Sequence, residues 1–378
     1  MVSLRISYSI FMSTQMEIFL VTLPGLEHTL AEEARANGFL VSAIETGGVT
    51  CKGGWPDVWR ANLILRGASK VLARIGGFRA MHLAQLDKRA RKFEWGEVLR
   101  ADVPLKVEAT CKRSKIYHAR AATQRIETAL RESFGATVSP EASMTLKVRI
   151  EDDLVTFSLD TSGEPLHKRG HKLGVGKAPL RETMAAMFLR QLGYDGSQAV
   201  VDPMCGSGTI CIEAAEIAMG LAPGRSRSFA FQNLASFNPS AWDAMRAPCE
   251  VLDIPQRYFA SDRDAGAIKM AAENAERSGV TDQIIFAQQG VSELQRPKTP
   301  PGIVLVNPPY GARIGNRKLL FSVYGALGKT LAERFRGWKV GIVTSDAGLA
   351  SSTGLSLKPA GPPVAHGGMR VVLHQAQL

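Results

Sequence analysis

From about residue 165 to its end, the chain alternates short apolar segments with stretches of helical periodicity. The apolar segments end in polar or glycine-rich corners and stand in AVVDPMCGSGT, RYFASDRD, GIVLVNPPYG and WKVGIVTSD. Fully apolar strands between helices are typical of a parallel sheet that is covered by helices on both faces. The pattern therefore predicts a doubly wound, Rossmann-like α/β domain over residues 165–378. The tail HGGMRVVLHQAQL is expected to add an antiparallel edge strand.

The residues before 165 have the mixture of strand-like and helical segments that is typical of small α+β units. MEIFLVTL predicts a strand, GLEHTLAEEARANGF predicts a helix, and MTLKVRIEDDLVTFSLD predicts a hairpin. We predict two N-terminal units, over residues 16–80 and 81–164. Residues 1–15 precede a second methionine, Met16, and are expected to be a disordered extension or the result of a misplaced start codon.

The net charge of the chain indicates which class of partner it binds. There are 46 Lys and Arg residues against 35 Asp and Glu, which gives a net charge of +11. A basic protein of this kind is expected to bind an anionic partner, and we favour nucleic acid over a membrane. No apolar run approaches the ~18 residues of a membrane span. The five cysteines form no C-x-x-C pair, so they indicate neither a zinc site nor a disulfide scaffold. Reduced thiols predict a cytoplasmic location.

The segment VVDPMCGSGTICIEAAEIA predicts a cofactor site. Asp202 ends a strand, Gly206 and Gly208 allow a tight turn, and a helix begins at Thr209. In an open α/β sheet, a cofactor binds at such a strand-to-helix corner. The spacing matches neither of the glycine motifs that hold dinucleotides or triphosphates, and no lysine follows it. A plain glycine turn is the alternative interpretation.

The next strand also ends in acidic residues. In YFASDRDAGAIKMAAENA, Asp262 follows the apolar segment directly and Asp264 begins a helix. A carboxylate at the end of the second strand suits hydrogen bonding to ribose hydroxyls. The separation between Asp202 and Asp262 is much longer than the ~20 residues usual in a dinucleotide fold, because a basic and aromatic insertion lies between them. We assign the ribose role to Asp262 and a helix N-cap role to Asp264.

The segment IVLVNPPYG places an amide and an aromatic ring at the end of a buried strand. Two consecutive prolines end the strand because they cannot donate to its hydrogen-bond ladder. The side-chain oxygen of Asn307 and the carbonyl of Pro308 can then accept hydrogen bonds from an exocyclic NH₂ group, and Tyr310 offers a ring for stacking. These corners resemble those of S-adenosylmethionine-dependent methyltransferases that act on a flipped or single-stranded base. Such catalysis needs positioning rather than a metal or a covalent nucleophile. A plain Pro-Pro turn is the alternative.

From Met16 onward the chain resembles a bacterial family that joins a ferredoxin-like piece and a THUMP RNA-binding domain to a class I methyltransferase domain. Members are often labelled N6-adenine-specific DNA methylases, and characterised relatives are guanine-N2 methyltransferases of 23S rRNA or tRNA. The matching segments are GLEHTLAEE, RANLILR, FSLDTSGEPLHKRGHK, APLRETMAA, DPMCGSGTICIEAA, PGRSRSFAF and NPPYGARIG. The resemblance implies THUMP at 81–164 and cofactor contacts at Arg181, Glu182, Thr183, Asp202, Pro203, Gly206, Gly208, Thr209, Asp262, Gly290, Val291 and Asn307. It implies that Asn307, Pro308 and Tyr310 hold the base.

The sequence departs from the family pattern at three places. The family commonly has R-G-Y-R where this chain has Arg-Gly-His-Lys at 169–172, and Glu where it has Ala312. The corner after the third strand usually carries an Asp that contacts the adenine amine, and the matching residue here is Gly290. The backbone N–H of Val291 remains available at that corner. Because of Gly290, a non-catalytic RNA-binding or ribosome-assembly factor is an alternative of a different class.

Three clusters mix Lys and Arg with His and aromatic residues, in DKRARKFEW, CKRSKIYHARAATQR and LHKRGHKLGVGK. Together they favour contacts to RNA phosphates over solvated helix faces. The sequence therefore predicts a metal-free, monomeric methyltransferase that uses S-adenosylmethionine to modify guanine N2 in 23S rRNA. Guanine N2 in tRNA and adenine N6 in DNA remain alternatives, since both bases present a planar amine.

Overall fold

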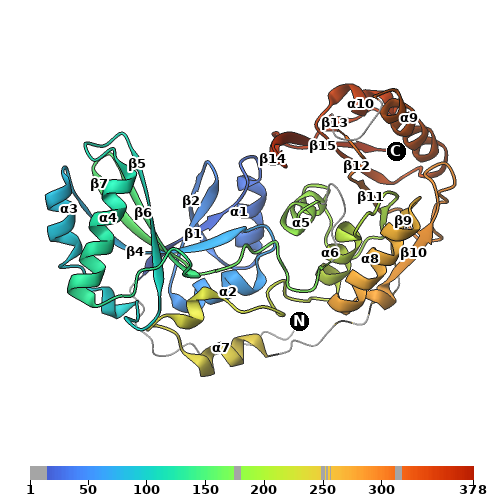
Figure 1. Cartoon of the computed structure of the whole chain (residues 1–378). Coiled ribbons are helices and arrows are strands. Elements are labelled where there is room, and N and C mark those ends of the chain that lie inside the picture. The colour runs from blue at the N-terminus through green and yellow to red at the C-terminus, as the bar shows by residue number, and fades with distance from the viewer. Residues whose placement is uncertain (1–14, 174–179, 248–251, 253, 256, 311–316) are drawn as a thin grey trace.

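The structure is a computed structural model in which residues 15–173, 180–247, 252, 254–255, 257–310 and 317–378 are described. The chain forms two sheets, one in each half, and the two halves lie beside one another (Figure 1). The predictions for residues 1–14 and for Ala312 fall outside the described residues.

The N-terminal sheet has seven strands in the order β2-β3-β1-β4-β7-β6-β5. The strands are β1 (Met16–Val21), β2 (Leu40–Glu45), β3 (Gly48–Gly53), β4 (Lys70–Arg79), β5 (Leu105–Lys112), β6 (Met144–Glu151) and β7 (Leu154–Asp160). Only β5 and β6 pair in parallel, and the expected hairpin is β6–β7. Strand β4 pairs with β1 on one side and β7 on the other. It therefore joins the two expected N-terminal units in one continuous sheet.

The helices of the N-terminal half pack their apolar side chains against the strands of its sheet. They are α1 (Glu27–Ala36), α2 (Trp55–Ile64), α3 (Leu83–Ala90) and α4 (Ala119–Ala129), with short helical turns at Trp95–Glu97 and Leu130–Phe134. Gly135 ends the last turn in a left-handed conformation with φ 73°, which glycine adopts without strain. The hydrophobic side chains of both halves form one connected core.

The C-terminal sheet runs in the order β10-β9-β8-β11-β12-β15-β13, with β14 paired to β15. The strands are β8 (Val200–Asp202), β9 (Tyr258–Asp262), β10 (Ile284–Gln288), β11 (Ile303–Val306), β12 (Lys339–Thr344), β13 (Lys358–Pro359), β14 (Val364–His366) and β15 (Met369–Gln377). Strands β8 to β12 are parallel and β15 is antiparallel to β12. This arrangement confirms the predicted Rossmann-like sheet and the antiparallel direction of the tail strand β15. The expected edge position is wrong, because β13 and β14 also pair with β15 and β13 stands at the edge.

The helices of this half are α5 (Glu182–Gln191), α6 (Thr209–Ala218), α7 (Pro239–Arg246), α8 (Ala265–Ser278), α9 (Arg317–Arg334) and α10 (Ala347–Ser352). Short turns stand at Ala230–Asn233 and Thr281–Gln283. Among the described residues, no helix is both long and apolar enough to cross a membrane.

The aromatic insertion between α6 and β9 packs against the N-terminal half. The Trp59 ring of α2 lies 6.1 Å from Phe231 and 5.7 Å from Phe237, measured between ring centroids. The N–H of Gly224 donates to the carbonyl of Leu63 at 2.9 Å. The insertion therefore connects the C-terminal half to helix α2. Its aromatic side chains pack in the core and do not form a surface for RNA.

Candidate active site

Three strand ends meet where the strand order of the parallel sheet reverses. Strand β8 lies between β9 and β11, so the chain leaves β8 toward β9 and β10 and later returns to the other side for β11 and β12. The register pairs Val200 with Ile303 on one side and with Tyr258 on the other. Ligands of open α/β sheets bind at the carboxyl ends of the strands at such a point. The corners after β8, β9 and β11 are the corners that the sequence singled out.

The corner after β8 is a tight glycine turn. Gly206 and Gly208 have φ of 51° and 82°, the left-handed region that favours glycine. A Cβ on Gly208 would stand 3.0 Å from Cβ of Ala271 on helix α8, so this glycine also allows close packing. Around Gly206 there is open space instead. The turn thus presents its backbone and the first residues of α6 to the crevice.

Two carboxylates flank this turn. Asp202 is buried at 2% exposure, and its Oδ1 accepts the N–H of Met204 at 3.2 Å. The pKa of Asp202 is raised to about 8, chiefly by burial, against the lowering effect of the Met204 N–H and with a smaller raising effect from the negative charge of Asp262. Asp262 is only partly buried, and it accepts the N–H of Gly206 at 3.1 Å and the N–H of Asp264 at 3.0 Å.

Asp264 is confirmed as a helix N-cap. Its Oδ1 accepts the N–H of Gly266 at 2.9 Å at the start of α8, and the side chain is exposed. The two neighbouring aspartates therefore have different roles. Asp262 hydrogen-bonds the turn after β8 and so connects two strand ends, whereas Asp264 caps helix α8.

The corner after β11 carries Asn307, Pro308 and Tyr310. Asn307 is partly buried and Pro308 is buried. Tyr310 is only 5% exposed, and burial raises its pKa to about 12. Little of the ring is therefore open to a base here, so stacking on Tyr310 would require the ring to become exposed when substrate binds.

The corner after β10 lies beside β9. The N–H of Gly290 donates to Oε2 of Glu293 at 3.0 Å, and the N–H of Gln289 donates to the carbonyl of Asp262 at 3.0 Å. The glutamate therefore places a carboxylate next to Gly290, at the corner where the family pattern has Asp. Val291 is partly buried in the same turn.

Sequence reasoning missed Lys172, which lies between two elements of the candidate site. Its Nζ is 2.7 Å from Oγ1 of Thr209 and 3.0 Å from Oε1 of Glu182, the first residues of α6 and α5. Glu182 and Thr183 are buried, whereas Arg181 is exposed and ends the loop before α5. The basic composition of LHKRGHK was the available signal, but it does not reveal which charges are buried.

The same segment corrects one interpretation of the sequence. Arg169 and His171 are buried at 2% and 6% exposure. Arg169 is paired with Glu213 at 3.0 Å, and Nε2 of His171 lies 3.1 Å from Oε1 of Glu216. These two side chains therefore cannot contact RNA phosphates, because they are buried against carboxylates of helix α6.

Helix α6 is also bound by the N-terminal half. Nη1 of Arg66 lies 2.8 Å from Glu213 and 3.1 Å from Glu216, and Arg225 lies 2.6 Å from Glu216. Burial opposes ionisation of Glu216, but the hydrogen bond from His171 and the charges of Arg66 and Arg225 outweigh it and hold its pKa below the usual range. The helix that begins at the glycine turn is thus locked to the segment that follows α2.

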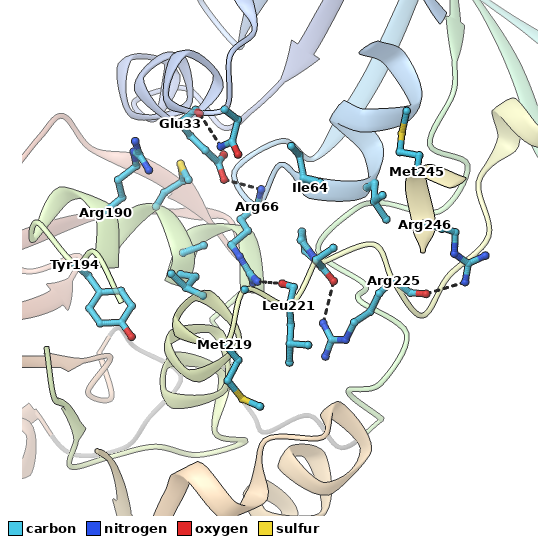
Figure 2. A pocket seen from close by; sticks show the side chains of 18 of the residues that line it. Glu33, Ile64, Arg66, Arg190, Tyr194, Met219, Leu221, Arg225, Met245 and Arg246 are labelled. Carbon is cyan, nitrogen blue, oxygen red and sulfur yellow. Dashed lines mark hydrogen bonds between the residues drawn. The ribbon is translucent and has the colours of Figure 1, made fainter. Parts of the chain in front are cut away.

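A cavity of about 730 Å³ lies at the other end of α6 (Figure 2). It is lined by residues of both halves, including Arg66, Arg190, Met219, Leu221 and Arg246. The 10 residues of α6 separate Met219 from the glycine turn by about 15 Å. The cavity is therefore not the corner at which the three strand ends meet.

The described residues offer no metal centre, since no three of their His, Cys, Asp or Glu side chains are grouped to hold an ion. Cys51, Cys111, Cys205 and Cys211 are free thiols, and Cys249 is outside the described residues.

Two family models match the chain. The model of the RMKL-like methyltransferase domain matches residues 169–358, and the model of the RlmL ferredoxin-like domain matches residues 17–72. Among curated proteins, the ribosomal RNA large subunit methyltransferase K/L of Syntrophotalea carbinolica is 34% identical over 359 residues, 89% of this chain and 50% of the relative. The enzyme of the same name from Vibrio campbellii is 30% identical over 346 residues, 88% of this chain and 49% of the relative. The chain spans about half the length of these curated relatives.

Solved structures share the architecture over nearly the whole chain. A predicted N6-adenine-specific DNA methylase from Listeria monocytogenes is 28% identical with a TM-score of 0.85, covering 96% of each chain. A proposed methyltransferase solved in complex with SAH is 27% identical with a TM-score of 0.82, covering 97% of this chain and 99% of its own. TrmN from Thermus thermophilus, 21% identical with a TM-score of 0.72 over 96% of this chain and 100% of its own, shows the likeness of fold alone.

Proposed function

The chain belongs to the family of RMKL-like, S-adenosylmethionine-dependent methyltransferases, and we propose that it methylates the exocyclic amine of a base in RNA, specifically guanine N2 of 23S rRNA. The observation that carries this proposal is the meeting of three corners at the switch point of the parallel sheet. One corner is a glycine turn, one is acidic, and one presents an amide oxygen.

The residues around β8 and β9 fit the cofactor. The open space at Gly206 admits a ligand against the backbone, and the partly exposed carboxylate of Asp262 retains lone pairs for ribose hydroxyls beyond its two backbone hydrogen bonds. We propose further contacts from Arg181, Glu182, Thr183, Asp202, Pro203, Gly208, Thr209, Gly290, Val291 and Asn307. When bound, the cofactor supplies an activated methyl group on its sulfonium.

The residues after β11 orient the acceptor. The Asn307 side-chain oxygen and the Pro308 carbonyl accept the two hydrogens of the amine, which aims the nitrogen lone pair toward the methyl group. Positive charge develops on that nitrogen as the methyl group transfers, so acceptors fixed at this corner stabilise the transition state. The rigid Pro308–Pro309 backbone holds them in place, which favours in-line displacement. We expect that methyl transfer requires no metal, because the residues act by positioning the amine in line with an already activated methyl group.

Two observations support RNA as the substrate. The net charge is +11, and curated relatives carry the name ribosomal RNA large subunit methyltransferase. Methylation of adenine N6 in DNA is the second candidate, because a solved relative is described as an N6-adenine-specific DNA methylase. The site does not separate them by chemistry, since Asn307 and Pro308 accept from either amine. We further propose that the enzyme works as a monomer in the cytoplasm.

The test is mass spectrometry of nucleosides from rRNA, tRNA and DNA of cells with and without the gene. We expect one N2-methylguanosine of 23S rRNA to disappear and to return when the wild-type gene is restored. Loss of N6-methyladenine from DNA would establish the second candidate instead. Unchanged nucleosides, together with no heat of S-adenosylmethionine binding in calorimetry, would identify a non-catalytic RNA-binding factor.

A further inference from the structure

The cavity between the two halves of the chain takes no part in the proposed reaction. Its volume is about 730 Å³, and it lies at the end of helix α6 opposite the glycine turn (Figure 2). Ligand sites of proteins are typically mostly apolar cavities of about 300–1,000 Å³, and they occur preferentially where domains meet. The cavity therefore has the size and the position of a binding site for a small molecule.

The walls of the cavity are held in place by contacts between the halves. They come from helices α1, α2, α5, α6 and α7 and from the segments that follow α2 and α6. Nη1 of Arg66 lies 2.8 Å from Glu213 of α6, and the N–H of Gly224 donates to the carbonyl of Leu63 at 2.9 Å. The cavity is thus preformed, so a ligand that enters it needs little ordering of the protein.

The lining of the cavity is chiefly aliphatic. Long, flexible apolar side chains come from Ile64, Met187, Met219, Leu221 and Met245. Tyr194 is the one aromatic residue that the described lining residues include, and it is only 7% exposed, with its hydroxyl 2.8 Å from that of Tyr258. No open ring face is therefore available among them for stacking a nucleobase. Adaptable thioether and aliphatic side chains instead fit a hydrocarbon chain.

The charged residues of the lining are mostly positive. Among the described lining residues, four are arginines and one is acidic, namely Arg66, Arg190, Arg225, Arg246 and Glu33. Arg66 and Arg225 are already paired with Glu216, at 3.1 Å and 2.6 Å. The carboxylate of Glu33 accepts the backbone N–H of Arg66 at 2.8 Å. An apolar cavity with an excess of arginine suits a ligand that has an apolar body and an anionic head.

Arg246 is the arginine best placed to hold that head. It is the last residue of α7, it is exposed, and it forms no ion pair with a carboxylate of the described part of the chain. One Nη2–H donates to the carbonyl of Arg225 at 2.9 Å, which steadies the guanidinium and leaves its other N–H groups for a ligand. Figure 2 shows Arg246 on the side of the cavity away from Glu33, whereas Arg190 lies on the Glu33 side, where a carboxylate repels an anion.

We propose that this cavity binds an aliphatic carboxylate, with its chain among Met219, Leu221 and Met245 and its head on Arg246. A guanidinium and a carboxylate form charge-assisted and often bidentate hydrogen bonds. The chain would remove its own apolar surface and that of the walls from water. The inference is independent of the proposed function, because the crevice where the three strand ends meet lies at the other end of α6.

The experiment measures the binding of octanoate to the full chain by a ligand-observed NMR titration. The comparison ligand is 1-octanol, which has a chain of the same length and no charge. We expect Arg246→Gln to weaken the binding of octanoate about tenfold and that of 1-octanol about twofold or less. Arg125→Gln is the matched control, because Arg125 is also an exposed arginine of a helix and does not line the cavity. It should leave both affinities unchanged.

A second variant tests the position of the chain. Leu221→Trp places a larger side chain in the cavity and should abolish the binding of both ligands, while an unchanged melting temperature shows that the fold is intact. If that variant is destabilised, the comparison of Arg246→Gln with Arg125→Gln decides alone. The inference is overturned if the wild type does not bind octanoate, if Arg246→Gln binds octanoate as the wild type does, or if it loses both ligands equally. Binding that survives in folded Leu221→Trp would likewise place the ligand elsewhere.

Discussion

The backbone N–H of Gly206 donates a hydrogen bond to Oδ2 of Asp262 at 3.1 Å. This bond connects the glycine turn after β8 to the carboxylate that ends β9. The other oxygen of Asp262 accepts the N–H of Asp264 at 3.0 Å, so the carboxylate is fixed from both sides. A single side chain thereby sets the geometry of two of the three corners in the candidate active site.

We therefore expect Asp262→Ala to weaken S-adenosylmethionine binding more than Asp264→Ala does. The first change removes a carboxylate that contacts the glycine turn and is proposed to bind ribose, so the dissociation constant should rise about tenfold or more. The second removes only an exposed helix cap and should change it about twofold or less. Isothermal titration calorimetry of both variants measures the difference. Equal losses would remove Asp262 from the cofactor site.

Asn307→Ala should fold normally and lose catalysis. The Pro308–Pro309 corner remains, but the amine loses one of the two acceptors that aim its lone pair. Loss of a preorganised polar group of this kind costs about 10²–10³ in turnover. We expect the loss in kcat rather than in RNA affinity, because the hydrogen bond strengthens as charge develops on nitrogen. The measurement is single-turnover methyl transfer with RNA and cofactor saturating.

Asn307→Asp is the control for that experiment. A carboxylate still accepts a hydrogen bond, so this variant should be damaged less than Asn307→Ala. Transfer by Asn307→Ala at the wild-type rate would show that the segment after β11 is only a turn and that the methyl acceptor is held elsewhere.

Asp202 should make the free energy of unfolding depend on pH. Its pKa is about 8 in the folded protein and about 3.9 in an unfolded chain, so between these values the folded state holds a proton that unfolding releases. This contribution to stability is fully present below about pH 4 and is lost as the pH rises through about 8.

Asp202→Asn should therefore flatten the pH dependence of stability. Asparagine is neutral at every pH and still accepts the N–H of Met204, so the variant should gain on the wild type by a few kcal/mol toward about pH 9. Melting temperatures between about pH 5 and pH 9 test this expectation. Asp264→Asn, which keeps the helix cap, is the control, and parallel profiles for wild type and Asp202→Asn would contradict the prediction.

Glu216 should be critical for stability because it is buried between the guanidinium groups of Arg66 and Arg225, beside His171. Glu216→Gln leaves the charges of Arg66 and Arg225 without this counter-ion, and removing one partner of a buried ion pair costs about 3–5 kcal/mol. The exposed pair of Glu164 and Lys168 is the comparison, with side chains 67% and 61% exposed. Glu164→Gln should cost less than about 1 kcal/mol. Urea unfolding of both variants gives the two values, and similar losses would show that the buried network does not hold the two halves together.

Local patterns decided what could be predicted about the candidate site. The cap formed by Asp264 depends on residues two positions away, and the glycine turn depends on Gly206 and Gly208 themselves. The apolar strands and their order along the chain predict a parallel sheet, and such a sheet brings its strand ends to one edge. The order of the strands along the chain therefore predicts that the corners lie together, and the sheet confirms it.

Contacts between distant segments could not be predicted in this way. Nη1 of Arg66 meets Glu213 and Glu216 only because the segment after α2 lies against α6, and Lys172 reaches Thr209 and Glu182 only because α6 and α5 both begin beside it. The burial of Tyr310 likewise depends on its surroundings in the fold. Composition gives the sign of a charge but not its exposure. The basic segment around Arg169 therefore predicts contacts to phosphates, although the Arg169 side chain is buried.

The sequence by itself determined the fold class, the family and the identity of the corner residues, because strand periodicity, glycine turns and caps are set by neighbours in the chain. The tertiary structure alone decided which charges are buried, which rings remain exposed, and how the N-terminal half is held against helix α6. These features depend on which surfaces come together when the two sheets dock, and no local pattern carries that information.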